Sequence, residues 1–432
     1  MKLTIEKSIY GGAGLARAEG KAVFVPFTLP GEIVEAQIAN DRGSYAEAEL
    51  INILEPSPAR VTAACQYFGE CGGCHYQHAS YPQQLEIKRQ ILQETLERAH
   101  LVTVPEIATL SADPLHYRNR ARFHIDRATS TLSYKKRGSH ANLPINACPI
   151  SAPILEEALQ LFNANATRWQ LAKHFDEVEA FTNADQSEML LTLWTRSSAA
   201  AAKVELQKLW PLIEKELPRT AGAAVFSAER RNERSRLLAS DGNQYLTYTA
   251  SGQNYRVSIG SFFQVNRALI DPLLDLVARN VSGKLAWDLY AGVGLFARSL
   301  LSRFEQVVAV ESAPSSVQDL RHNLSGGPHR TVASTTLDFL RRARTPGKEH
   351  PDLVIPDFVI ADPPRAGLGK EVTALLAEIR PAHITYVSCD PATLSRDLKS
   401  LLDSGYSLHQ LHMVDMFPQT FHLESVAKLS LT

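Results

Sequence analysis

Hydrophobic and polar residues follow three different patterns along the chain. Residues 1–59 contain short apolar runs separated by glycines, which predicts a small β-barrel of the OB type. Residues 60–250 are mixed in pattern and include an amphipathic helix at 81–100. From residue 251 to residue 432, strand-like and helical segments alternate, as in a parallel, doubly wound sheet. We therefore predict an α/β fold with a barrel domain, a mixed α+β central domain and a Rossmann-like domain on which the helix packs.

Composition places the protein among ordinary globular chains. Its 432 residues suggest two to four domains, and 44% hydrophobic with 21% charged residues is a typical soluble balance. The N-terminal sequence MKLTIEKSIYGG lacks the apolar core of a secretory signal. No uncharged apolar run approaches the ~18 residues of a membrane span. Five cysteines, an odd number, do not suggest disulfide pairs. We expect a monomeric, cytoplasmic protein without a membrane partner.

Local charge points to RNA although the net charge is only −1. Residues 118–137 contain seven lysines and arginines against one acid, Asp126. If this segment is a strand, Arg118, Arg120 and Arg122 share one face. Solvated surface is the alternative, but we favour phosphate contact because such an imbalance exceeds what solubility requires. Shorter basic clusters, which we interpret as solvated surface, occur at 230–236 and 341–344.

Four of the cysteines suggest a metal centre. Cys65, Cys71 and Cys74 lie within ten residues, with glycines between them, and Cys148 precedes a proline far along the chain. Zinc is one candidate, because four-cysteine zinc sites exist and His75 is adjacent. An iron–sulfur cluster is the other, because a Cys-Pro fourth ligand occurs in such proteins. The spacing alone leaves both open.

A glycine turn marks a cofactor site in the predicted Rossmann-like domain. In KLAWDLYAGVGLFARSL, a strand leads through Gly292 and Gly294 into a helix, so that the backbone can approach a ligand. Glu311 follows 19 residues after Gly292, at the end of the next predicted strand, where an acid holds ribose hydroxyls. Both NAD and S-adenosylmethionine carry such a ribose.

Two further strand ends distinguish these cofactors. DFVIADPPRAGL ends a strand at Asp362, and a D-P-P turn there is typical of S-adenosylmethionine-dependent methyltransferases. Arg365 stands where amino-group methyltransferases carry an aromatic residue, which argues against a nitrogen acceptor. In TYVSCDPATLSRDL, an apolar run ends in Cys389, where ligands bind in open α/β sheets. We interpret this thiol as a nucleophile rather than a packed side chain.

These motifs resemble those of the bacterial RNA uracil-5-methyltransferases, which act on large-subunit rRNA and on the tRNA T-loop. The similarity covers the whole chain and is most specific in DPPRAGL, YVSCDPATLSRDL, DMFPQTFHLESV and GSFFQVN. The N-terminal segment with GGAGLA and LPGE is similar to the TRAM domain of that family. The resemblance implies [4Fe-4S] ligands at Cys65, Cys71, Cys74 and Cys148. It implies contacts with S-adenosylmethionine at Gln264, Tyr290, Glu311, Asp338 (on the adenine side) and Asp362.

The resemblance also assigns the chemistry. C5 of uracil is too weak a nucleophile to take a methyl group directly, so Cys389 adds to C6 first and Glu424 removes the C5 proton afterwards. His422 is a neighbour that either orients groups or serves the fold. Two positions depart from the family pattern: Asp390 stands where Asn is commoner, and Leu295 occupies a position that is polar in some members. The uridine must leave its stack, so loop or single-stranded RNA is expected.

We therefore expect an S-adenosylmethionine-dependent enzyme that methylates C5 of a uridine in 23S rRNA. The same reaction on the T-loop uridine of tRNA is the alternative within the enzyme class. An iron–sulfur protein that binds RNA or senses redox state without turnover is the alternative from another class. The presence of Cys389, Glu424 and Asp362 together argues against that second alternative.

Overall fold

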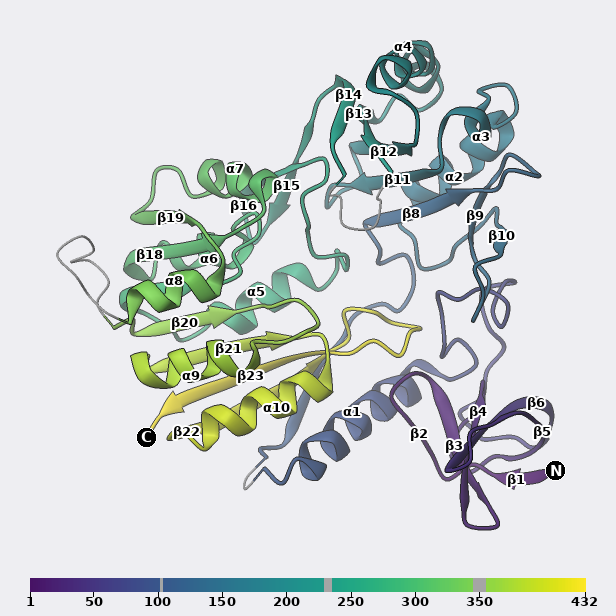
Figure 1. The fold of residues 1–432 in the computed structure, drawn as a ribbon, viewed down its shortest axis with the longest axis horizontal. Coiled ribbons are helices and arrows are strands. Elements are labelled where there is room, and N and C mark those ends of the chain that lie inside the picture. The colour runs from purple at the N-terminus through teal and green to yellow at the C-terminus, as the bar shows by residue number, and fades with distance from the viewer. Residues whose placement is uncertain (102–103, 229–234, 345–354) are drawn as a thin grey trace.

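The computed structural model describes residues 1–101, 104–228, 235–344 and 355–432. Along the colour scale of Figure 1, the chain forms an N-terminal β-sheet (purple), a central part (blue to teal) and a C-terminal layered part (green to yellow). Most of the basic cluster at 230–236 falls outside the described ranges. Within those ranges, no helix has both the length and the apolar character needed to cross a bilayer.

Alternating burial builds the N-terminal sheet. Val23 and Val25 face its core together with Leu3, Ile5 and Val34. The strands are β1 (Lys2–Thr4), β2 (Lys7–Ser8), β3 (Ala13–Ala18), β4 (Lys21–Pro26), β5 (Ile33–Asp41) and β6 (Tyr45–Glu55). They pair in the order β1-β5-β6-β4-β3-β2, in which β4 and β6 run parallel. The sheet curls into a half-barrel, as the short, glycine-punctuated runs predicted.

The central part is a sheet covered by helices. Its strands are β8 (Arg120–Ile125), β9 (Leu132–Lys135), β10 (Asn142–Pro144), β11 (Glu177–Thr182), β12 (Met189–Thr195), β13 (Thr220–Ser227) and β14 (Leu237–Gly242). They pair in the order β10-β9-β8-β11-β12-β13-β14. The helices are α2 (Pro153–Asn165), α3 (Leu171–His174) and α4 (Ala199–Glu216). Phe123, Phe162, Leu191 and Leu206 meet in one apolar core between sheet and helices, so this part has a core of its own.

The C-terminal part is a doubly wound sheet. Its strands are β17 (Gly283–Asp288), β18 (Phe304–Glu311), β19 (His329–Ala333), β20 (Phe358–Ala361), β21 (His383–Ser388), β22 (Tyr406–Val414) and β23 (Glu424–Leu431). They pair in the order β19-β18-β17-β20-β21-β23-β22, and β23 runs antiparallel to both neighbours. The helices are α5 (Ile270–Ala278), α6 (Leu295–Leu300), α7 (Pro314–Asn323), α8 (Thr336–Ala343), α9 (Gly369–Ile379) and α10 (Pro391–Leu402). The alternation predicted from the sequence is therefore present.

Both faces of this sheet are buried, as parallel sheets require. Ala286 of β17 packs into the core with α5, α6 and α7, whereas its neighbours Leu285 and Trp287 pack into the core with α8, α9 and α10. One strand thus contributes alternate residues to two apolar layers. The sheet is held rigidly between them, which positions the loops at its edges.

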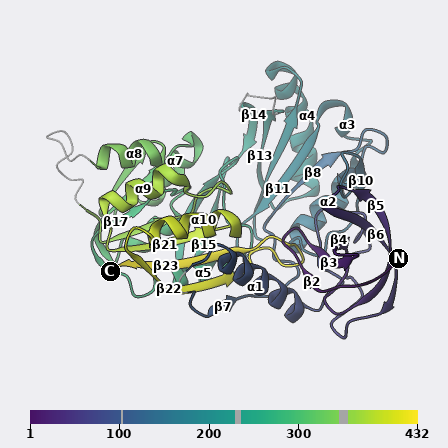
Figure 2. The same ribbon diagram turned by 60° about the horizontal axis from the view of Figure 1, so that its bottom comes forward.

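Helix α1 (Tyr81–Arg98) and strand β7 (Ile107–Leu110) complete the C-terminal part, although they come early in the chain. β7 pairs in parallel with β22 at the sheet edge, and Leu92 and Leu96 of α1 pack into the core with α10. The strand was not foreseen, because residues 60–250 were assigned to the central domain. Figure 2 shows α1 beside the yellow strands, near the N-terminal sheet.

The hairpin of β15 (Tyr245–Ala250) and β16 (Gln253–Ser258) spans the boundary predicted at residue 251. Tyr248 and Tyr255 of this hairpin are buried in the core that includes α5 and α6. The predicted boundary therefore falls within a hairpin whose two strands pack together into the core with α5 and α6.

Candidate active site

The carboxyl ends of neighbouring strands bring the predicted residues to one edge of the C-terminal sheet. Asp288 and Glu311 end β17 and β18, Asp362 follows β20, and Cys389 follows β21. β17 pairs with both β18 and β20, and β20 pairs with β21, so the four side chains come from adjacent strands. Ligands bind at this edge in open α/β sheets.

The glycine turn after β17 needs glycine at two positions. Gly292 and Gly294 have φ angles of +54° and +92°, which side chains with a Cβ rarely adopt. A Cβ on Gly294 would also lie 2.8 Å from Leu320 Cδ1. The Gly292 amide donates a hydrogen bond to Glu311 Oε2 at 2.9 Å. The carboxylate predicted to hold ribose hydroxyls therefore also fixes the turn.

Asp288 is a site residue that the sequence analysis missed. Its Oδ2 accepts a hydrogen bond from the Ala297 amide at 2.9 Å, while its Oδ1 is buried without a hydrogen-bond partner among the described residues. Burial, with smaller contributions from Asp362 and Glu311, raises the pKa of Asp288 to about 8. The available signal was an acid four residues before the first glycine of the turn.

The three carboxyl groups around the turn favour a cationic ligand. Burial raises the pKa of Asp362 to about 7, and Gln264 Nε2 donates a hydrogen bond to its Oδ2 at 3.2 Å. Opposite charge stabilises ionised carboxylates, whereas the pyrophosphate of NAD would add further negative charge. The sulfonium and amino groups of S-adenosylmethionine supply such positive charge. Gln264 and Asp362, predicted as cofactor contacts, thus lie together.

The structure gives less direct support for the remaining predicted cofactor contacts. Tyr290 follows β17 and packs, partly buried, beside the core of α8 to α10. Asp338 takes part in the cap of α8: its carboxylate accepts the Thr335 hydroxyl at 2.7 Å and its amide donates to Thr335 Oγ1 at 3.1 Å. Leu295 is buried in the first turn of α6. The adenine contact of Asp338 stays a prediction, because helix capping already accounts for this residue.

Strand register places Cys389 beside Glu424. β21 and β23 are antiparallel, and Ser388 pairs with Ser425. Cys389 comes one residue after Ser388, and Glu424 one residue before Ser425, so they face each other across the two strand ends. The thiol and the carboxyl group come from segments far apart in sequence, yet they share the rim with Asp362.

Comparisons with known proteins show which protein family this chain belongs to. A family model described as tRNA (Uracil-5-)-methyltransferase matches residues 80–342 and 348–431, and a TRAM domain model matches residues 1–51. The chain belongs to this methyltransferase family. It is an RNA uracil-5-methyltransferase with an N-terminal TRAM domain and uses S-adenosylmethionine.

Named relatives extend over the whole length. A 23S rRNA (uracil(1939)-C(5))-methyltransferase of Shewanella amazonensis is 32% identical, and the match covers 99% of this chain and 95% of the relative. An uncharacterized RNA methyltransferase of Aquifex aeolicus is 32% identical over 99% of this chain and 98% of the relative. The Pyrococcus abyssi tRNA (uracil-54, C5)-methyltransferase, solved with S-adenosyl-L-homocysteine, has a TM-score of 0.78 at 23% identity over 99% of this chain and 100% of that one. That structure shows the same fold.

The methyltransferase keeps its thiol and carboxyl group in a buried, acidic environment. Burial, aided by Glu424 and Asp362, raises the pKa of Cys389 to about 12. Burial and Asp362 also raise the pKa of Glu424 well above its usual range, while Arg365 acts in the opposite direction on both groups. Burial therefore favours the protonated form of both groups, and positive charge nearby favours their ionisation.

His422 and Asp390 support the rim. His422 Nδ1 lies 3.5 Å from Arg365 Nη2, and burial together with Arg365 lowers the pKa of His422 to about 4, so the ring is neutral. Asp390 caps α10, because its Oδ1 accepts the amides of Ala392 and Thr393 at 3.0 and 2.9 Å. An asparagine would cap equally well. The departure at Asp390 therefore leaves the loop after Cys389 intact.

The segment from Asp415 to Glu424 is held from outside the sheet. The His75 and Tyr76 amides donate to the Gln419 carbonyl at 2.8 and 3.0 Å, so the cysteine-containing segment contacts it directly. The Gln84 side chain of α1 donates to Gln419 Oε1 at 3.0 Å and accepts from the Gln419 amide at 3.0 Å. Two earlier parts of the chain thus determine where Glu424 sits.

The four cysteines predicted to bind metal line one cavity of about 280 Å³; they are Cys65, Cys71, Cys74 and Cys148. Tyr134 donates its hydroxyl to Cys148 Sγ at 3.9 Å, and the Gly73 amide donates to Cys71 Sγ at 3.4 Å. In the described part of the chain, no three His, Cys, Asp or Glu side chains are grouped closely enough to hold a single metal ion.

The basic run at 118–137 differs from its prediction. Arg120 and Arg122 share a face of β8, but Arg120 pairs with Glu179 at 3.5 Å and Arg122 pairs with Glu177, both on β11. Arg118 lies before the strand and lines the cysteine cavity instead. The three side chains do not form one row of free guanidiniums, because the neighbouring strand supplies carboxylates that the local sequence does not reveal.

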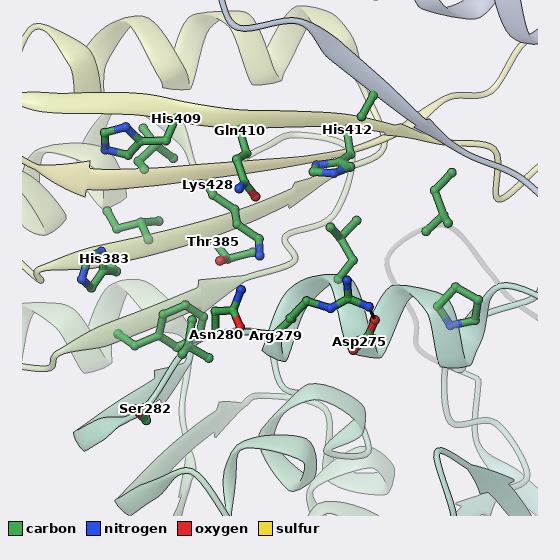
Figure 3. A pocket seen from close by; sticks show the side chains of 18 of the residues that line it. Asp275, Arg279, Asn280, Ser282, His383, Thr385, His409, Gln410, His412 and Lys428 are labelled. Atoms are coloured by element: carbon green, nitrogen blue, oxygen red, sulfur yellow. Dashed lines mark hydrogen bonds and ion pairs between the residues drawn. The ribbon is translucent and has the colours of Figure 1, made fainter.

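A separate cleft of about 1200 Å³ lies away from this rim (Figure 3). It is bounded by α5 and by the face of β21, β22 and β23, with His383, Gln410 and Lys428 on the strand side. His383 begins β21, whereas Cys389 follows its other end. The cleft is therefore not part of the methyltransferase site.

Proposed function

We propose that the chain methylates C5 of a uridine in 23S rRNA through a covalent bond between Cys389 and C6. The facing positions of Cys389 and Glu424 at the ends of β21 and β23 carry this proposal. The 32% identity to a relative named as a 23S rRNA (uracil(1939)-C(5))-methyltransferase, over 99% of this chain, supports the choice of RNA.

The thiol makes C5 reactive. Addition requires the thiolate, so the Cys389 thiol first gives up its proton to water. Sγ then bonds to C6, the C5–C6 π electrons move toward C4 and its oxygen, and C5 gains nucleophilic character. C5 then bonds to the methyl carbon that S-adenosylmethionine supplies as an electrophile on its sulfonium sulfur, and S-adenosylhomocysteine leaves. Covalent addition splits one difficult step into two easier ones.

Glu424 completes the reaction as the base. After methyl transfer, C5 carries both a methyl group and a proton. The ionised Glu424 takes that proton, the C5–C6 double bond re-forms, and the C6–Sγ bond breaks to release Cys389. This order requires Glu424 to be ionised at that stage, although burial favours its protonated form in the empty site. The sulfonium charge is gone once the methyl group has been transferred, so the positive charge that favours the ionised form at this stage comes from Arg365, which acts to lower the pKa of Glu424.

The cysteine cavity fits an iron–sulfur cluster better than zinc. A tetrahedral zinc site has Zn–S bonds of about 2.3 Å, which requires its sulfurs to be closely grouped. Four thiols instead surround a cavity of about 280 Å³. A [4Fe-4S] cluster held by Cys65, Cys71, Cys74 and Cys148 would fill that space and connect the central part to the segment that bears Glu424.

The test is methyl transfer to purified RNA. Tritiated S-adenosylmethionine is offered with 23S rRNA and, separately, bulk tRNA, both from cells without 5-methyluridine. Label at one uridine of 23S rRNA is expected. Label in tRNA alone would contradict the rRNA assignment, and label at an atom other than C5 would contradict the reaction.

The tRNA T-loop uridine is the second candidate substrate. The description of the matching family model names tRNA. The solved structure that matches this chain with a TM-score of 0.78 is also a tRNA (uracil-54, C5)-methyltransferase. The same pair of assays separates the two substrates.

A further inference from the structure

A cavity of about 380 Å³ lies between the TRAM sheet and the cysteine segment. Tyr10 and Phe24 line it from the TRAM side, and His75 and Arg137 line it from the other side. Its volume is in the range of pockets that bind small organic groups. The candidate cofactor site and the cysteine cavity do not include it.

Aromatic and guanidinium surfaces meet in this cavity. The Arg137 guanidinium lies over the Phe27 ring, with Cζ 4.7 Å from the ring centroid. Phe27 also has a φ of +61°, a conformation that costs a non-glycine residue energy and that concentrates at functional sites. Proteins bind unpaired bases by stacking them on aromatic rings and arginine planes.

His75 offers a polar group in the same cavity. Its Nδ1 is buried without a hydrogen-bond partner among the described residues. A buried ring nitrogen without a partner can form a hydrogen bond with the polar edge of a nucleobase.

The acidic side of the cavity narrows the ligand class. Asn40, Glu47 and Glu49 line it, and Asn40 Nδ2 donates to Glu47 Oε2 at 3.1 Å. Carboxylates repel a phosphate group but accept hydrogen bonds from the exocyclic amino groups of bases. Adenine, cytosine and guanine carry such an amino group, and uracil does not.

Tyr10 connects this cavity to the reaction centre. Its hydroxyl lies 3.5 Å from Asp390 Oδ2, and Asp390 directly follows the nucleophile Cys389. Burial raises the pKa of Tyr10 to about 12, with further contributions from Asp390 and Cys389. A base held in the cavity would therefore lie one side chain away from the rim at which the target uridine reacts.

We infer that this cavity binds an unpaired adenine, cytosine or guanine of the RNA substrate near the target uridine, and so helps to select which uridine is methylated. The inference deepens the proposed RNA methylation and rests on it. It gives the TRAM sheet a role in reading a base rather than only in contacting the RNA backbone.

Photochemical crosslinking tests which nucleotide enters the cavity. p-Benzoylphenylalanine replaces Phe24, and in a matched control it replaces Ile51, which is 49% exposed on the same sheet outside the cavity. The probe is 23S rRNA or tRNA, whichever is methylated, and reverse transcription locates the crosslink. A discrete stop at an unpaired A, C or G near the target is expected from position 24 alone. Equal stops from both positions, stops at paired nucleotides, or no stop would overturn the inference.

Substitution of two exposed acids gives an independent test, because the two variants should change RNA affinity in opposite directions. Glu49→Gln removes an acceptor in the cavity, and Glu35→Gln removes an exposed carboxylate of the same sheet that lies outside it. Loss of negative charge by itself strengthens RNA binding. If Glu49 accepts a hydrogen bond from a base, its variant instead raises the KM for RNA about tenfold, while the Kd for S-adenosylmethionine is unchanged.

Equal behaviour of these two variants would overturn the inference. A wild-type protein that transfers no methyl group would instead contradict the proposed function. In that case the crosslink, read on 23S rRNA and tRNA alike, would still report whether a base occupies the cavity.

Discussion

Lys88 and Asp415 form an ion pair from which water is excluded. Lys88 Nζ lies 2.5 Å from Asp415 Oδ1, and neither side chain is exposed. Lys88 Nζ also donates to the Phe417 carbonyl at 3.0 Å, and Tyr81 donates its hydroxyl to Asp415 Oδ2 at 2.9 Å. Helix α1 is thereby joined to the segment that ends at Glu424. The catalytic rim depends on a helix more than 300 residues earlier in the chain.

Lys88→Met should destabilise the protein strongly. Removing one partner leaves Asp415 as a buried, uncompensated charge, which costs about 3–5 kcal/mol of unfolding free energy. Lys7→Met is the matched control, because Lys7 pairs with Glu94 at the same 2.5 Å but with side chains 33% and 36% exposed. That change should cost less than about 1 kcal/mol. Urea unfolding measures both, and equal losses would contradict the assigned role of burial.

Glu424→Gln should trap an enzyme–RNA adduct. The amide keeps the shape of Glu424 but cannot take the C5 proton, so addition and methyl transfer proceed while release of Cys389 does not. The adduct should survive denaturing electrophoresis and carry tritium from the labelled donor. Cys389→Ala should give neither turnover nor adduct. Normal turnover by Glu424→Gln would exclude Glu424 as the base.

Affinity for S-adenosylmethionine should rise with pH between about 6 and 9. The pKa values of Asp288 and Asp362, about 8 and about 7, leave both carboxyl groups largely protonated below this range, and ionisation creates the negative charge that attracts the cation. Isothermal titration calorimetry over pH measures this change. Asp288→Asn should flatten the profile, and affinity that is constant over this range would contradict the assigned charge interaction.

The ligand-free protein should show the opposite trend in stability. A carboxyl group whose pKa is raised on folding stabilises the folded state while it is protonated, and this contribution is lost as pH rises through the folded pKa. Both carboxyl groups have an ordinary pKa of 3.8, so thermal stability without the donor should fall from about pH 4 and level off near pH 8. The decline should be smaller in Asp288→Asn, because the amide does not ionise.

Cys71→Ser should remove the predicted iron–sulfur chromophore. Loss of one of four ligands weakens the cluster, and with it the link between the central part and the Gln419 segment. Anaerobic purification followed by iron and sulfide analysis should give about four irons per chain for the wild type. Cys389→Ser is the control and should keep the full content. Stoichiometric zinc without sulfide would contradict the cluster.

Apolar runs predicted the part of the rim that lies at the carboxyl ends of strands, whereas Glu424, which begins β23, was predicted only from the family resemblance. Cys389, Asp362 and Glu311 stand at the ends of strands that are buried on both faces. Asp288, like Glu311, is the last residue of such a run, but no motif singles it out, because its burial and its unpartnered oxygen are properties of the assembled site.

Long-range partners could not be predicted from local pattern. Lys88 looks like a surface residue of an amphipathic helix until Asp415 is placed against it. In the same way, the alternation of Arg120 and Arg122 on β8 was read correctly, but their carboxylate partners come from β11. Periodicity reports which face a residue occupies, and only tertiary structure reports what lies opposite that face.

The pairing of β7 with β22 also determines when the enzyme can first become active. A ribosome releases β7 about 300 residues before β22, an interval on the order of 15–60 s at ~5–20 residues per second. During that interval Ile107 and the apolar side of α1 have no sheet to cover them. The methyl-transfer site is therefore assembled last, after translation is nearly complete. For the same reason, residues 251–432 alone would lack both the edge strand β7 and the helix α1 that covers the sheet beside it.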